Sequence, residues 1–125
     1  MNKLTIIGNL TRDPELRTTQ DGRQVCNFTV AVNRRNRREG QPEADFFRVS
    51  AWGQLGQNCG KFLAKGKKVC AVGEVSVSTY TGNDGVTRAQ MDVFAQDVEF
   101  LSPKDAQGGY TPVDEPDDPF RGMNQ

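Results

Sequence analysis

Histidine is absent from this chain of 125 residues. Without imidazole the sequence holds no Ser-His-Asp or Cys-His pair, no His-ligated metal, and no base whose ordinary pKa lies near neutrality. A GxxxxGK[ST] phosphate loop is also absent, as is a GxGxxG turn between a strand and a helix. These absences argue against hydrolytic and dinucleotide redox chemistry, so we expect a protein that is not an enzyme and uses no cofactor.

Cysteines and long apolar runs are also scarce. The three cysteines, Cys26, Cys59 and Cys70, are odd in number and show no CxxC spacing, so we expect buried small side chains rather than disulfides or a zinc site. Apolar runs fall short of the roughly 18 residues of a membrane helix, and the start, MNKLTIIGNL, is too interrupted for a signal peptide. We therefore expect a cytoplasmic protein.

The formal net charge of zero hides a division of the chain into two parts. Residues 1–101 carry 14 Lys and Arg against 11 Asp and Glu, whereas residues 102–125 carry 2 against 5. The second part is rich in Gly, Pro, Asp and Gln and cannot bury enough apolar surface to offset the entropy lost on ordering. We predict one domain over 1–101, mildly basic, and a disordered acidic tail over 102–125.

One stretch, ADFFRVSAWG at 44–53, raises a functional question. Side chains alternate across a strand, so one face carries a leading Asp45 and then three apolar residues that suit a core, Phe47, Val49 and Ala51. The opposite face carries Phe46, Arg48 and Trp52. Unpaired nucleobases stack on aromatic rings while cations contact the phosphates, so this face is typical of single-strand binding.

The remaining pattern predicts five strands and one helix. The strands are expected at 3–10, 24–34, 44–52, 67–80 and 87–101, and the helix at 54–65. Residues 11–23 are predicted to be a loop, with Asp21-Gly22 closing a hairpin onto the next strand. The last strand changes its apolar parity near Gln96-Asp97, which predicts a bulge there.

An antiparallel Greek-key barrel of five strands with a helix between strands three and four is the OB-fold, an all-β fold. The segments LTIIGNLTRDPELR, VCNFTVAVNR, FRVSAWGQLGQNCGKFLAKGKKVCAVGEV and TYTGNDGVTR resemble, in this order, the bacterial single-stranded DNA-binding protein family. The resemblance covers residues 1 to about 101. It implies binding and protection of single-stranded DNA, without strong sequence preference, in replication, recombination and repair, and association with the nucleoid.

The resemblance assigns stacking roles to Phe46, Trp52 and Tyr80. A further aromatic of the family would fall near Asn36, where this chain departs from the pattern. Cationic contacts to phosphate are expected from Arg34, Arg35, Arg37, Arg38, Arg48 and Arg88. For Lys61, Lys65, Lys67 and Lys68, phosphate contact and a merely solvated position remain equally open.

The resemblance also implies a homotetramer, in which the first strand pairs with its copy and two dimers stack. Family tails end in an acidic run closed by Pro-Phe, which docks onto proteins of DNA metabolism. Here the matching residues are Asp117, Asp118, Pro119 and Phe120. RGMNQ follows Phe120, which therefore has no free carboxylate, so we expect weakened or altered docking.

Two other functions remain as alternatives. One is an RNA-binding or protein-docking barrel. The other is a metal-dependent phosphodiesterase using Asp45, Asp92 or Asp97, although these acids are scattered among strands and lack a nearby His or Lys base.

Overall fold

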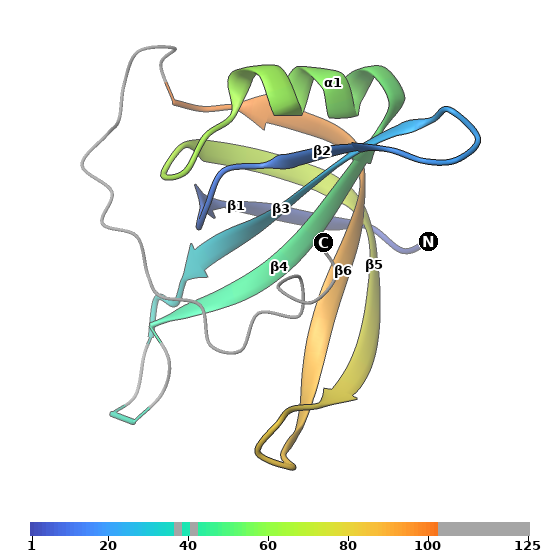
Figure 1. Cartoon of the computed structure of the whole chain (residues 1–125). Helices are drawn as coiled ribbons and strands as arrows, with labels where there is room; N and C mark the ends of the chain where they lie inside the picture. The colour runs from blue at the N-terminus through green and yellow to red at the C-terminus, as the bar shows by residue number, and fades with distance from the viewer. Residues whose placement is uncertain (37–38, 41–42, 103–125) are drawn as a thin grey trace.

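The structure, a computed structural model, describes residues 1–36, 39–40 and 43–102 (Figure 1). Its elements, in chain order, are β1 (Leu4–Leu10), β2 (Glu15–Thr18), β3 (Gln24–Asn33), β4 (Ala44–Trp52), α1 (Gly53–Phe62), β5 (Lys68–Thr81) and β6 (Thr87–Phe100). The predicted disorder of the tail concerns residues that, from 103 onward, lie outside the described part.

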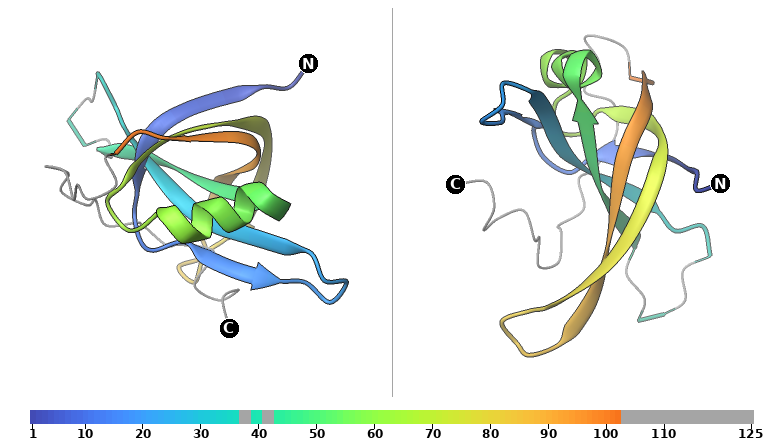
Figure 2. Two further views of the ribbon diagram at one scale, coloured as in Figure 1. Left: turned by 90° about the horizontal axis from the view of Figure 1, so that it is seen from above. Right: turned by 90° about the vertical axis from the view of Figure 1, so that its right-hand side faces the viewer.

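The strands form a closed barrel. They are ordered β1-β5-β6-β4-β3-β2, and an additional pairing of β1 with β3 joins the ends of the five long strands (Figure 2). Between the described strands, all pairings are antiparallel except that of β4 with β6, which is parallel. The expectation of a wholly antiparallel barrel is therefore wrong for this pair. The chain reverses twice between the two strands, once through α1 and once through the β5–β6 hairpin, so they run the same way.

A sixth, short strand corrects the predicted loop over 11–23. β2 pairs with the start of β3, with Glu15 opposite Asn27 and Thr18 opposite Gln24. Sequence pattern missed β2 because its residues are mostly exposed and show no apolar alternation. The predicted hairpin is confirmed: the Thr19 N–H donates to the Arg23 carbonyl at 2.7 Å, and Gly22 adopts a φ of 86°.

The barrel interior is filled by fully buried side chains from most strands, with α1 packed across one end (Figures 1 and 2). Phe28, Val30, Val49, Val69 and Val93 are among the largest of them. From α1, Cys59 enters this core, whereas Phe62 is exposed. The helix ends three residues earlier than predicted, because Leu63 already has an extended backbone.

Two of the three cysteines match the expectation. Cys26 and Cys59 are fully buried in the core, and burial raises their pKa values to about 11 and about 12. Cys70 is only half-buried, which corrects the expectation that all three are core residues. Along β5 it alternates with Val69 and Ala71, which point inward, so it lies on the outer face of the barrel.

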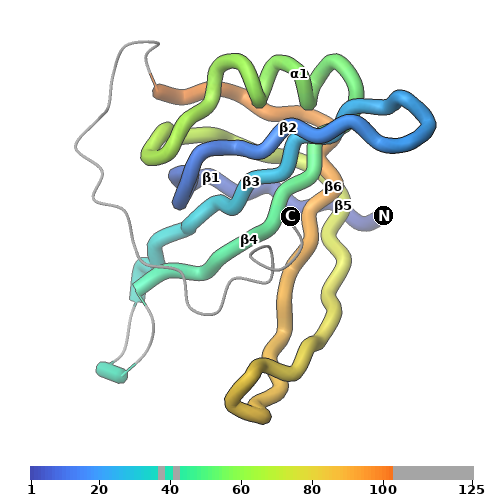
Figure 3. The backbone as a smooth tube through the Cα atoms, viewed as in Figure 1, coloured from blue at the N-terminus to red at the C-terminus, as the bar shows by residue number. Residues whose placement is uncertain are grey.

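β5 and β6 form a long hairpin that extends beyond the barrel (Figure 3). Val72 lies opposite Asp97 and Gly73 opposite Ala95, which leaves Gln96 as an extra residue and confirms the predicted bulge. A Cβ at Gly73 would overlap the backbone carbonyl of Phe94, so the close approach of the two strands requires glycine there. In the described part of the chain, no helix combines the length and apolarity needed to cross a membrane.

Candidate nucleic-acid interface

The two faces of β4 are sorted as the alternation predicts. Val49 and Ala51 are fully buried, and Phe47 packs against the core. On the outer face Phe46 and Arg48 are half-buried, and the side chain of Trp52 is 41% exposed. Neither Phe46 nor Trp52 belongs to the core, so both rings are placed on the surface face of the barrel wall.

Trp52 is the last residue of β4, which passes directly into α1. The junction of these two elements lies beside the β2–β3 hairpin (Figure 1). The Cζ atom of Arg23, on that hairpin, stands 4.9 Å from the centroid of the indole ring, within the range of a cation–π contact. The two side chains border an open surface cavity of about 580 Å³. Its lining residues are Gly22, Arg23, Gln24, Trp52, Gly53 and Gln57.

Arg23 is a site residue that the sequence pattern did not reveal. It follows the Asp21-Gly22 turn, and its place becomes visible only in the register, where Val25 lies opposite Trp52. The turn alone could have suggested an exposed arginine but not its tryptophan neighbour. The hairpin tip is held by the Thr19 hydroxyl, which donates to Asp21, and by Arg23 Nε, which donates to the same carboxylate at 3.0 Å.

Arg48 is the most deeply placed cation of the face. It lies directly opposite Asp92 in the parallel β4–β6 pair, and its Nε is 2.7 Å from an Asp92 oxygen. Its Nη1 donates to the amide oxygen of Gln90 at 3.2 Å. The side chains of Arg48 and Asp92 are 15% and 23% exposed. The predicted phosphate contact therefore starts from a guanidinium that already has a carboxylate partner.

Tyr80 and Arg88 face each other across the β5–β6 hairpin. Tyr80 is half-buried, and Arg88 Nη2 is 2.5 Å from a carboxylate oxygen of Asp84 in the hairpin turn. The hydrogen bond from Arg88 is the largest cause that lowers the pKa of Asp84 to about 2. The hairpin thus presents an aromatic ring and a cation side by side.

The arginines after β3 are only partly described. Arg34 donates through Nε and Nη2 to one oxygen of Asp45, at 3.0 and 2.7 Å, and Arg35 is exposed. Arg37 and Arg38 lie outside the described residues. The predicted phosphate contact of Arg34 therefore also starts from a guanidinium with an acidic partner at the start of β4.

These groups line up along one outer surface. Phe46 and Trp52 are six residues apart on β4, which corresponds to about 20 Å at roughly 3.3 Å per residue. Phe47 lies opposite Met91, so Arg88 and its neighbour Tyr80 continue the line beyond the Phe46 end. At the other end of the line, the guanidinium of Arg23 lies over the ring of Trp52. The structure brings together on one face Phe46, Arg48, Trp52, Tyr80 and Arg88, whereas Arg34 lies beside Asp45, which has the parity of Phe47.

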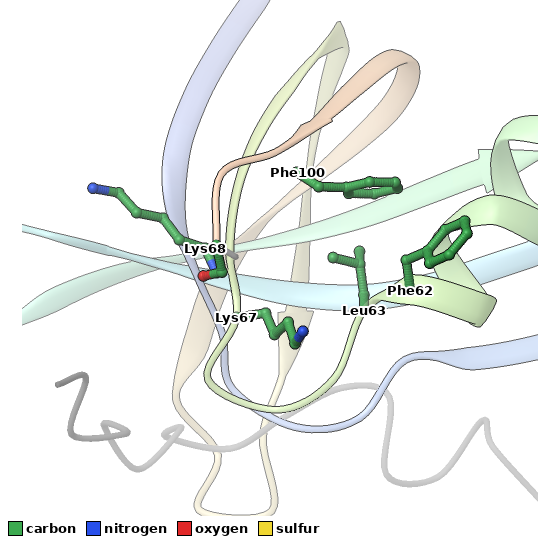
Figure 4. A pocket seen from close by; sticks show the side chains of 6 residues that line it. Phe62, Leu63, Lys67, Lys68 and Phe100 are labelled. Carbon is green, nitrogen blue, oxygen red and sulfur yellow. The ribbon is translucent and has the colours of Figure 1, made fainter. Parts of the chain in front are cut away.

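A second cavity, of about 230 Å³, lies between the end of α1 and the end of β6 (Figure 4). The rings of Phe62 and Phe100 border it, with centroids 5.9 Å apart and planes inclined by 52°. Lys67 and Lys68 also line it, and the Lys68 side chain extends away from the rings in Figure 4. Lys61 places its ammonium 5.4 Å from the Phe62 ring. These contacts shield part of an apolar surface that the barrel end leaves exposed.

The carboxylates that a metal-dependent phosphodiesterase would need are not gathered at one site, and two of them are paired with arginines. Asp45 pairs with Arg34 and Asp92 with Arg48. Over residues 1–36, 39–40 and 43–102, no group of three or more His, Cys, Asp or Glu side chains is placed to hold a metal ion. The geometry of these residues therefore gives the metal-dependent alternative no support.

A closed barrel with a helix across one end, and with rings and guanidinium groups on one outer face, defines an OB-fold of the nucleic-acid-binding class. Comparison with known families makes the assignment specific. The model of the single-strand binding protein family matches residues 1–101. The chain belongs to this family.

Individual relatives agree with this assignment. The chain is 39% identical over 133 aligned positions to single-stranded DNA-binding protein 2 of Clostridium acetobutylicum, covering 96% of this chain and all of that protein. It is 38% identical to the single-stranded DNA-binding protein of Oceanobacillus iheyensis, covering 87% of this chain and 68% of that protein.

A solved structure is similar as well. It is a deletion mutant of the single-stranded DNA binding protein from Thermus aquaticus, with a TM-score of 0.63 and 30% sequence identity. The similarity covers 82% of this chain and 42% of that chain. The chain therefore matches less than half of the solved protein, and the shared part supports the barrel fold.

Proposed function

We propose that this protein binds single-stranded DNA, without strong sequence preference, along the outer face of β4 and the β5–β6 hairpin. The observation that carries the proposal is the placement of Trp52, an exposed indole outside the core that shares a face with Phe46 and has a guanidinium beside it. Every base has a π-face, so such rings bind unpaired strands of any sequence.

The bases stack on Phe46, Trp52 and Tyr80, and arginines contact the phosphates. The proposed arginines are Arg34, Arg35, Arg48 and Arg88, with Arg37 and Arg38 from the part of the loop that is not described, and Arg23 is added to them. This is a binding role within the family, and it serves replication, recombination and repair by covering exposed strands. The domain that carries it spans residues 1–101, the range of the family match.

The protein acts as a homotetramer in this proposal. β1 pairs with β5 over Leu4–Asn9 but with β3 only at Asn9 and Leu10. Within the described chain, the other edge of β1 over residues 4–8 therefore has no strand beside it, and Ile7 is 51% exposed. An unpaired edge with an apolar side chain favours pairing with a second copy. Light scattering should give four chains per particle, and a monomer mass at micromolar concentration would contradict the assembly.

The tail makes the contacts to other proteins of DNA metabolism, through Asp117, Asp118, Pro119 and Phe120. These residues lie outside the described part. Their sequence combines two carboxylates with a phenyl ring, which suits a basic pocket with an apolar floor. A peptide of residues 108–120 should bind a partner pocket of this kind more tightly than a peptide of residues 108–125. Equal affinities would show that the residues after Phe120 do not matter.

Replacement of the tryptophan tests the binding face directly. Trp52→Ala should weaken binding of oligo(dT) by about 1–3 kcal/mol per site, the usual contribution of one stacked base. Binding to the unaltered protein should quench its fluorescence, because Trp52 is its single tryptophan. Phe62→Ala, also an exposed ring but placed at the other cavity, is the control and should bind normally. Equal binding by the unaltered protein, Trp52→Ala and Phe62→Ala would contradict the proposed binding face.

RNA of equal length serves as the competitor that tests the alternative. An RNA-binding barrel would prefer RNA through its 2′-hydroxyl groups. We expect oligo(dT) to displace the RNA, and the reverse preference would favour the alternative function.

A further inference from the structure

Four of the arginines that we propose to contact phosphate share a feature that the DNA-binding proposal does not require. Each of them forms an ion pair with an aspartate. At the centre of the face, Arg48 lies 2.7 Å from Asp92. At the start of β4, Arg34 lies 2.7 Å from Asp45. In both cases the acid belongs to a strand of the barrel wall, so the carboxylate is fixed by the same ladder that holds the stacking rings.

The two hairpins repeat the arrangement. Arg23 Nε lies 3.0 Å from Asp21 in the β2–β3 turn, and Arg88 Nη2 lies 2.5 Å from Asp84 in the β5–β6 turn. These acids come from the same turn or strand end as their arginines, two and four residues away. The pairs of Arg23, Arg48 and Arg88 lie along the line that runs from Tyr80 to Trp52. The fourth pair, Arg34 with Asp45, lies at the start of β4, where Asp45 has the parity of Phe47 and not of Phe46.

We propose that these four aspartates occupy the phosphate positions of their arginines in the DNA-free protein, and that DNA binds by exchanging each carboxylate for a phosphate. The inference rests on the proposed function and adds what the arginines bind before and after DNA arrives. A carboxylate and a phosphate both offer oxygens to the same guanidinium donors, so the aspartate and the incoming strand compete for them.

Competition between aspartate and phosphate predicts the direction in which DNA affinity changes when an aspartate loses its charge. A carboxylate that stays next to its arginine repels the incoming phosphate and cancels part of the attraction. The hydrogen bond from Arg88 lowers the pKa of Asp84 to about 2, the direction expected where a guanidinium stabilises the carboxylate that it contacts. Removing the charge from one aspartate should therefore strengthen binding. An opposite role, in which the acid only orients the arginine for DNA, predicts weaker binding after the same change.

The experiment compares charge-neutral variants of the full chain. Asp92→Asn and Asp45→Asn keep the side-chain shape and remove one negative charge each. Asp97→Asn removes the same charge from β6 at the bulge, outside the four arginine–aspartate pairs, and controls for the change in net charge. Circular dichroism melting establishes that each variant is folded. Binding of dye-labelled oligo(dT) is then titrated by fluorescence anisotropy at several salt concentrations, because this readout does not depend on Trp52.

We expect Asp92→Asn and Asp45→Asn to bind up to about fivefold more tightly than Asp97→Asn, the upper range for an exposed or partly exposed ion pair. The slope of log affinity against log salt should become steeper, by up to about 0.7 for each arginine released to a phosphate. Affinities equal to or below that of Asp97→Asn would overturn the exchange. Should Asp92→Asn unfold, Asp45→Asn, at the exposed start of β4, decides the question alone.

The same titrations separate this inference from the proposed function. Trp52→Ala is included in the series. If it binds weakly while the aspartate variants match their control, the face binds DNA and the exchange is wrong. If Trp52→Ala binds normally, the proposed face itself is wrong.

Discussion

Arg23 offers the sharpest test of how the Trp52 site is built, because its effect can be measured with and without DNA. Its guanidinium stands 4.9 Å from the indole centroid and is tethered to Asp21 at 3.0 Å. A cation–π contact at an exposed site contributes about 0.5–1 kcal/mol. In Arg23→Ala this contact is lost and the indole should become more accessible, so acrylamide should quench its fluorescence more strongly in the DNA-free protein.

The DNA-bound state should respond in a different way. In the bound state we expect Arg23 to move from the indole to a phosphate, because a base needs the ring face that the guanidinium covers. Arg23→Ala should therefore reduce the slope of log affinity against log salt by about 0.7, the value for one neutralised phosphate on a single strand. The measurement is a set of oligo(dT) titrations between low and moderate salt.

Arg17→Ala is the matched control, because it removes a positive charge from the exposed strand of the same hairpin. It should leave the acrylamide quenching unchanged and alter the salt slope less than Arg23→Ala does. If the two variants behave alike in both measurements, Arg23 has no special relation to Trp52. The contact at 4.9 Å would then be incidental to binding.

Three further changes test the fold around the face. Gly73→Ala should destabilise the protein by about 1–3 kcal/mol in urea unfolding, because the new methyl group overlaps the Phe94 carbonyl; an unchanged midpoint would contradict this. Burial raises the pKa values of Cys26 and Cys59 from 9.0 to about 11 and about 12. These thiols therefore contribute stability below pH 9 that is lost as the pH rises toward the raised values. In Cys59→Ala the free energy of unfolding should fall less steeply over this pH range. The Asp84 carboxyl should titrate near pH 2 by NMR and move toward 3.8 in Arg88→Ala.

Much of the face could be predicted because it depends on local alternation. Once 44–52 is a strand, the period of two assigns Phe46 and Trp52 to one side and Val49 to the other, whatever the partner strands are. The bulge was visible for the same reason, since an extra residue at Gln96 shifts the parity of the apolar positions within one strand. The Asp21-Gly22 hairpin follows from turn chemistry in two residues.

The missed features depend on pairing between distant segments. β2 has too few buried residues to show a period, and its four residues become a strand only through the ladder with β3. Arg48 meets Asp92 because the β4–β6 pair is parallel, and that direction was predicted wrongly. Arg23 reaches Trp52 through the β3–β4 register. A single sequence does not specify such registers, so the partners of the arginines were invisible.

The charge balance of the chain follows from these pairings. A net charge of zero would ordinarily argue against a polyanionic ligand, yet a phosphate responds to the groups within a Debye length, about 8–10 Å at ordinary salt, and not to the sum over the chain. On the proposed face the local net charge also stays low, because the opposite charges of Arg48 and Asp92 lie 2.7 Å apart. Stacking on Trp52 and Phe46 must then supply a larger share of the affinity than it would on a strongly basic barrel. Binding to this protein should accordingly survive added salt better than binding to a barrel whose arginines lack acidic neighbours.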